Sequence, residues 1–131
     1  LRDRGRGTLI TTELLPGKAE TARRNLTDAG LEDIVEIRVG DALQTLTDLT
    51  GPVDVLVLDG RNDQYLAVLG LVGPLLATNA LVLADLGEND PDLLAYQHHV
   101  RQPHSGYVSM ELRLDAGIEL SVRTSHNGAA P

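Results

Sequence analysis

The sequence predicts an α/β fold built on a doubly wound, mostly parallel sheet that ends in an antiparallel hairpin. Three observations predict it. Apolar or β-branched runs alternate along the chain with helical patterns, which favours a parallel sheet with right-handed crossovers. Two of these runs, residues 53–58 and 80–84, are almost wholly apolar, which is typical of strands covered on both faces. Near the end, two alternating runs over 107–114 and 118–124 flank a short loop that contains Gly117.

The first part of the chain contains a strand and a helix. Residues 8–12 are β-branched and apolar, so we expect a strand that ends at Glu13. Pro16 suits a first helical turn. Apolar side chains spaced three and four residues apart then predict an amphipathic helix over 18–29, which Gly30 stops.

The remaining elements continue the same alternation. A second strand is expected over 34–39, and a short helix with leucines three residues apart follows it. The third strand, 53–58, is followed by a predicted helix over 63–76. After the fourth strand, 80–84, a helix over 91–100 begins at Asp90 or Pro91, and the hairpin completes the domain. We therefore expect one partial domain over 1–124 and a flexible tail over 125–131.

Composition excludes several classes of protein. The chain has 131 residues, a net charge of -8, 42% hydrophobic residues and no cysteine, so disulfides and thiolate metal sites are excluded. No apolar run approaches the roughly 20 residues that span a bilayer, and no secretory signal is visible. The acidic balance argues against nucleic-acid and anionic-membrane binding. We expect a cytoplasmic protein without nucleic-acid or membrane partners.

A carboxylate lies at or just after the end of each of the four successive parallel strands. In open α/β sheets, ligands bind beyond the carboxyl ends of the strands, so these residues are candidates for a site. They are Glu13, Asp41, Asp59 and Asp85.

The first two carboxylates each have a functional and a structural interpretation. An acid in the position of Glu13 can accept both hydroxyls of a ribose, or it is a solvated loop residue. In Gly40-Asp41-Ala42, a short acid beside a small residue lets an adenine ring lie against the backbone. Asp41 is equally a candidate N-cap for the helix that follows.

The last two carboxylates are expected at the centre of the sheet edge. Asp59 either faces the crevice or caps the next helix. Asp59 and Asp85 together suit a hard cation such as Mg²⁺, or they repel each other and raise one pKa. Tyr65 is a packed helix residue or a ligand contact.

Taken together, these residues resemble the class I S-adenosylmethionine-dependent O-methyltransferases of the catechol and caffeoyl-CoA type (family 3). Three segments carry the resemblance, and they preserve its order. They are Thr11-Thr12-Glu13 with Ala22-Arg23-Arg24-Asn25-Leu26, Val39-Gly40-Asp41-Ala42-Leu43, and Val53-Asp54-Val55-Leu56-Val57-Leu58-Asp59-Gly60 with Tyr65. The resemblance implies a Rossmann-like methyltransferase fold. It also implies that S-adenosylmethionine is held by Glu13, Gly40, Asp41, Ala42, Asp59 and Tyr65.

The sequence departs from this family in three places. The family's first strand and glycine-rich loop are absent, so the resemblance implies an N-terminally truncated domain. The family's metal-binding Asn falls on Leu86, which has no ligand atom, leaving only Asp59 and Asp85 for Mg²⁺. The family's Lys falls on Asn62, so either Asp59 is the general base or the acceptor loses its proton through its own acidity.

The resemblance implies transfer of a methyl group to the hydroxyl of a small, phenolic acceptor. The alternative is a non-catalytic, degenerate member that binds a nucleoside or a protein partner. Because a missing central strand leaves unpaired sheet edges, we also expect a homodimer, formed through the hairpin over 107–124 or through the exposed edges.

Overall fold

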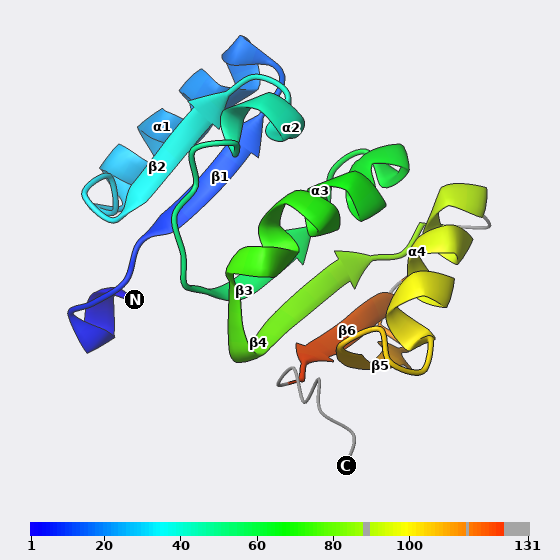
Figure 1. The fold of residues 1–131 in the computed structure, drawn as a ribbon. Coiled ribbons are helices and arrows are strands. Elements are labelled where there is room, and N and C mark those ends of the chain that lie inside the picture. Colours follow the sequence, from blue (N-terminus) through cyan, green and yellow to red (C-terminus); the bar gives the residue numbers. More distant parts are fainter. Residues whose placement is uncertain (88–89, 115, 125–131) are drawn as a thin grey trace. The chain divides into compact units, whose positions relative to one another are not determined.

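In the computed structural model of the protein, residues 1–87, 90–114 and 116–124 are described. The predicted tail over 125–131 and the hairpin-loop residue Asp115 lie outside these residues. The chain divides into two compact units, Leu1–Asp48 and the part from Leu49 onward. Six strands form two sheets, one in each unit (Figure 1). None of the described helices is long and apolar enough to cross a membrane.

The first unit is a β-α-β arrangement with a short helix at each end. Its strands β1 and β2 pair in parallel, from Leu9 opposite Val35 to Glu13 opposite Val39. The elements are the 3-10 helix η1 (Arg2–Arg4), β1 (Leu9–Glu13), α1 (Pro16–Asp28), β2 (Val35–Val39) and α2 (Ala42–Thr45).

The first unit buries few side chains, and ionic contacts supplement this packing. All of its residues are described, and Ala19 of α1 alone is buried. The Arg38 guanidinium on β2 donates to the Thr45 carbonyl at 2.6 Å and to the Asp48 carboxylate at 2.6 Å. These two bonds tie the end of α2 and the segment after it to the two-stranded sheet.

The second unit contains a four-stranded mixed sheet in the order β3-β4-β6-β5 (Figure 1). β3 pairs with β4 in parallel, and the other two pairings are antiparallel. The elements are β3 (Val53–Leu58), η2 (Asn62–Gln64), α3 (Tyr65–Val72), η3 (Gly73–Leu75), β4 (Leu76–Asp85), α4 (Pro91–Arg101), β5 (Tyr107–Leu112) and β6 (Ile118–Arg123). The predicted terminal hairpin is therefore confirmed.

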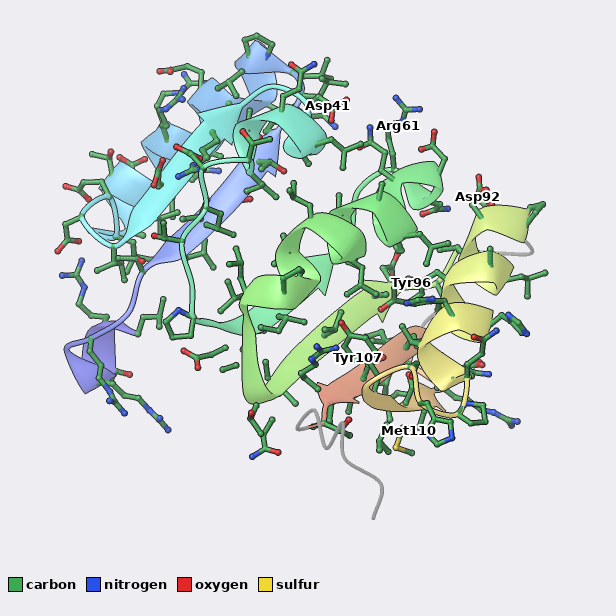
Figure 2. All side chains as sticks on the ribbon, viewed as in Figure 1. Asp41, Arg61, Asp92, Tyr96, Tyr107 and Met110 are labelled. Atoms are coloured by element: carbon green, nitrogen blue, oxygen red, sulfur yellow. The ribbon has the colours of Figure 1, made fainter. Side chains whose placement is uncertain are left out.

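Helices α3 and α4 cover one face of this sheet. The Tyr65 ring of α3 meets the Tyr96 ring of α4 edge to face, with centroids 5.7 Å apart. Figure 2 shows Tyr96 between the two helices. The buried strand residues Val82 and Ala84 lie in register with Ser121 and Glu119, so all four share this covered face.

The opposite face of the four-stranded sheet is apolar and largely exposed. Val57 of β3 is 63% exposed, and Val108 and Met110 of β5 are 67% and 58% exposed. The prediction that residues 53–58 and 80–84 are covered on both faces is wrong for the described residues. β3 is an edge strand of this sheet, and α3 and α4 lie on the other face.

The predicted helix over 63–76 is shorter than expected. α3 ends at Val72, a 3-10 turn covers Gly73–Leu75, and the strand already begins at Leu76. Pro74 has no backbone N–H, so it cannot supply the bond that would continue an α-helix.

A buried carboxylate joins α4 to the hairpin. The Glu119 side chain is 0% exposed and forms an ion pair with the Arg101 guanidinium of α4. It also accepts from the Ser109 hydroxyl at 2.7 Å and from the Gln97 amide at 3.0 Å. Burial raises the pKa of Glu119, but the bonds from Arg101, Ser109 and Gln97 outweigh it, so the pKa lies below its ordinary value.

We predict that Arg101→Met destabilises the protein by about 2–3 kcal/mol at neutral pH, because a buried carboxylate loses its counter-ion. The pKa of Glu119 is lower in the folded protein than in the unfolded chain. The ionised carboxylate therefore stabilises the fold fully above the unfolded-state pKa of Glu119, and this stabilisation is lost as the pH falls through the folded-state pKa. The deficit of the variant therefore shrinks on acidification. Urea unfolding at several pH values measures it.

The matched control is Arg113→Met, which removes the same charge from an exposed position after β5. Its effect is expected to stay within about 0.5 kcal/mol. A loss of stability in Arg101→Met that does not change with pH would contradict the assignment to Glu119.

Candidate functional site

The predicted adenosine-binding residues of the first unit lie together at the carboxyl ends of β1 and β2. Parallel pairing sets Glu13 opposite Val39, and the Gly40 amide donates to the Glu13 carbonyl at 3.0 Å. Asp41 and Ala42 follow directly and begin α2 (Figure 2). Glu13 and Asp41 therefore lie at one edge of the two-stranded sheet, as the sequence predicts.

Both carboxylates of this edge also hold the local backbone. Glu13 Oε1 accepts from the Leu15 amide at 2.8 Å, just before α1 begins. Asp41 Oδ1 accepts from the Leu43 amide at 2.8 Å, which makes Asp41 the N-cap of α2. A carboxylate has two oxygens that can each accept more than one bond, so a capping role does not exclude a ligand contact.

Gly40 is required by the shape of this turn. Its φ is +137°, a conformation that L side chains rarely adopt, and a Cβ there would lie 3.0 Å from the Thr45 methyl carbon. Glycine thus lets the backbone turn from β2 into α2 while the Thr45 methyl lies close to the turn.

In the second unit, Asp59, Asp85 and Tyr65 meet at the carboxyl ends of β3 and β4. The Tyr65 hydroxyl donates to the backbone carbonyl of Asp85 at 3.2 Å. Its ring is buried and packs on Tyr96, so the structural interpretation of Tyr65 as a packed helix residue holds. The Asp59 and Asp85 side chains are exposed.

The electrostatic environment of Tyr65 reflects both acids. Burial, together with the smaller effects of the nearby charges of Asp85 and Asp59, raises the pKa of Tyr65 to about 12. The phenol therefore stays protonated at neutral pH and acts here as a hydrogen-bond donor.

Leu86, at the position of the family's metal-binding Asn, has a structural role. Leu86 is buried, and its amide donates to the Gly117 carbonyl at 2.9 Å, which ties the end of β4 to the hairpin loop. Within 1–87, 90–114 and 116–124, no three His, Cys, Asp or Glu side chains group closely enough to hold a metal ion. Asp59 and Asp85 thus have no third carboxylate or imidazole beside them in these segments.

Sequence reasoning missed one contact beside this edge. The Asn62 amide donates to Asp90 Oδ2 at 2.8 Å, while Asp90 Oδ1 caps α4 by accepting from the Asp92 amide at 2.9 Å. The Asn62 bond, followed by the Asp92 amide, holds the pKa of Asp90 below its usual value. The position of Asp90 before Pro91 predicts a helix cap, but no sequence pattern predicts the contact between Asp90 and Asn62, which lies 28 positions earlier.

The candidate residues thus form two sets, one in each unit. The first unit brings together Glu13, Gly40, Asp41 and Ala42, and the second brings together Asp59, Tyr65 and Asp85. Each set lies where parallel strands end, which is where ligands bind in open α/β sheets. That the two sets hold one ligand between them stays a prediction.

Comparison with known proteins shows that this chain is similar to methyltransferases. A sequence model of a family described as a methyltransferase domain matches residues 1–85. A catechol O-methyltransferase of Mycobacterium tuberculosis is 38% identical over 80 residues, which are 60% of this chain and 36% of that protein.

Two solved structures illustrate the similarity in fold. A methyltransferase from Geobacter sulfurreducens is 26% identical, with a TM-score of 0.75 over 90% of this chain and 59% of that one. The O-methyltransferase TomG from Streptomyces achromogenes, solved in complex with SAM, is 21% identical, with a TM-score of 0.77 over 91% of this chain and 63% of that one. The chain thus spans little more than a third of the curated relatives it matches.

We predict that Asp85→Asn lowers the pKa of Tyr65 below its value of about 12, because the variant removes a negative charge but keeps the backbone carbonyl that the phenol binds. Asp59→Asn should lower this pKa by less, since Asp59 contributes less to the shift. An NMR titration of the Tyr65 ring signals measures both effects.

Asp54→Asn is the control, because Asp54 lies on β3 four residues before its end and is exposed. If this variant moved the Tyr65 pKa as far as Asp85→Asn does, the placement of Asp85 beside the phenol would be wrong.

Proposed function

We propose that this chain, which belongs to the methyltransferase domain family, is part of an S-adenosylmethionine-dependent O-methyltransferase that acts on a hydroxyl of a small, phenolic acceptor. Residues 1–124 would contribute part of one methyltransferase domain. The observation that carries the proposal is the set of carboxylates at the strand ends. All four lie within the residues that match the family, and each unit presents two of them at one sheet edge.

The edge of the first unit fits the nucleoside part of the cofactor. Glu13 uses Oε1 for the Leu15 amide, and its second oxygen can accept from ribose hydroxyls. Asp41 caps α2 through Oδ1, and because a carboxylate oxygen can accept more than one hydrogen bond, Asp41 can also accept from the amino group of adenine. Beside this turn, Ala42 has only a methyl side chain, which suits a flat ring that lies against the backbone.

When bound, S-adenosylmethionine supplies a methyl group on a sulfonium, which is already an activated donor. We assign Asp59 as the group that accepts the proton of the acceptor hydroxyl while the oxygen–carbon bond forms. Methyl transfer would leave the sulfur as a neutral thioether, and the proton of the acceptor hydroxyl would end on the Asp59 carboxylate. Asp59 and Asp85 both place negative charge near the Tyr65 hydroxyl, and such charge attracts a cationic sulfonium.

The residues do not fit a family-type magnesium site, so no step is routed through a metal. The third ligand position is Leu86, whose side chain is apolar and buried. Asp59 and Asp85 alone would leave most of the six positions of a Mg²⁺ ion to water.

A second candidate function is a non-catalytic member that binds a nucleoside or a protein partner. Two contacts favour it. The position of the family's lysine is Asn62, which is bonded to Asp90, and the position of its metal ligand is Leu86, which is bonded through its backbone to Gly117. Both positions therefore support the fold around the site and carry no group for the reaction.

We also propose a cytoplasmic location and a homodimer in which a second copy covers the open face of the four-stranded sheet. Four strands at about 4.8 Å spacing and six residues at about 3.4 Å each give a flat apolar area about 20 Å on a side. Such an area approaches the size of faces that form protein contacts. Val57 and Val108 are its most exposed members.

We predict that S-adenosylmethionine, added to the whole chain, shifts the amide NMR signals of Glu13, Gly40 and Asp41 with weak, millimolar-range affinity. Asp41→Asn should reduce this binding by about tenfold, because asparagine keeps the N-cap but loses the charge. The result tests the adenosine-binding edge without requiring turnover.

Glu20→Gln is the control, because Glu20 is an exposed acid of α1 away from the strand ends. Absence of any shift at Glu13 and Gly40 would overturn the proposed cofactor site. Binding without methyl transfer to catechol would favour the non-catalytic candidate.

We predict that the wild-type chain is a dimer in light scattering and that Val108→Asp makes it monomeric, since a charge on the open face opposes its burial. Leu94→Asp is the matched control, because Leu94 is 63% exposed on α4, outside this face. A monomeric wild type would contradict the dimer.

A further inference from the structure

A cavity lies in the second unit, at the end of the sheet opposite Asp59 and Asp85. It is a groove of about 850 Å³, a size typical of sites for small molecules. Leu66 and Leu69 of α3 line one side, and Tyr107 and Arg123 of the hairpin line another. Its floor includes Leu76, the first residue of β4, so the groove belongs to the amino end of the parallel strands.

The groove carries basic side chains in a chain that is acidic overall. The chain carries 19 acidic residues against 11 basic ones, yet among the described residues no acidic side chain lines the groove. Arg123 and His99 line it instead, beside the hydroxyls of Thr78 and Ser105. The groove therefore combines apolar walls with a basic group, in a protein whose net charge is -8.

Arg123 is positioned by its neighbours. Its guanidinium lies over the Tyr107 ring, 5.1 Å from the ring centroid. Gly106 has a φ of +86°, and a Cβ there would lie 2.8 Å from Arg123 Nη1, so only glycine leaves room for this arrangement. A guanidinium carries five N–H donors in a planar fork that matches the two oxygens of a carboxylate.

The opposite side of the groove is kept open by small residues of α3 and the turn after it. Gly70 lies within a helix, where glycine is unfavourable, and a Cβ there would meet no atom within 4 Å. Gly73 allows the Tyr107 hydroxyl to come within 3.3 Å of the position that a Cβ would take. A larger side chain at Gly70 would extend into the groove.

We propose that this groove binds an organic carboxylate with an apolar body, such as a short acyl or aryl acid. The carboxylate pairs with the Arg123 guanidinium, and the apolar body lies against Leu66, Leu69 and Leu76. This site is separate from the strand ends that carry Asp59 and Asp85, and it does not depend on methyl transfer.

The experiment titrates the whole chain with hexanoate, and with hexan-1-ol and acetate as matched probes, by NMR. Hexanoate is expected to shift the signals of Thr78, Tyr107 and Arg123 at lower concentration than either probe, since it alone has both the charge and the apolar body. Hexan-1-ol binding as tightly as hexanoate would overturn the proposed role of Arg123. Shifts confined to Val108 and Met110 would place the acid on the open sheet face and overturn the site.

Two variants with matched controls test the two parts of the groove. Arg123→Gln should weaken hexanoate binding about tenfold or more, whereas Arg113→Gln should leave it unchanged. An equal loss in both variants would show that only the net charge matters, which contradicts the proposal.

Gly70→Leu keeps the charge, fills the groove and favours the helix, so this variant should fold at least as stably as the wild type. It should lose hexanoate binding, while Ala67→Leu, at an exposed position of α3 outside the groove, should retain it. Retained binding in Gly70→Leu would overturn the proposal even if Arg123→Gln failed to fold.

Discussion

Parallel pairing of neighbouring strands is the constraint on which the candidate site depends. β1 runs beside β2, and β3 runs beside β4, each pair in the same direction. Residues that follow the two strands of a pair must therefore lie at one edge of their sheet. This is why Glu13 lies beside Gly40, and why Tyr65 experiences the charges of both Asp59 and Asp85. An antiparallel pair would have placed the same residues at opposite ends.

These edges could be predicted from the sequence because the residue patterns that mark them are local. A β-branched or apolar run that stops at an acid marks both the strand and its end, as at Glu13 and Asp85. The start of β4 was not predictable in the same way. Leu76 continues the helical spacing of α3. The helix ends earlier because Pro74 has no N–H to donate to the turn before it.

What the sequence could not predict depends on residues far apart in the chain. Glu119 occupies an inward position of an alternating strand, and its partner Arg101 lies 18 positions earlier on another element. Asn62 and Asp90 are separated by 28 positions. Likewise, an apolar strand such as 53–58 reveals that it can be buried on two faces, but not whether helices cover both of them. Tertiary packing decides such cases, because it determines which neighbour each side chain meets.

The two ends of the four-stranded sheet have opposite electrostatic character, and this follows from the same strand directions. Asp59 and Asp85 lie at the carboxyl end of β3 and β4, whereas Arg123 lies at the other end, beside the first residues of β4. A strand of six residues is about 20 Å long, which is about twice the Debye length of about 8–10 Å at physiological salt. The charges at one end are therefore largely screened from the other. A cationic group drawn to the acids and an anion drawn to Arg123 would thus bind without strong mutual influence, so one small sheet can support two independent sites.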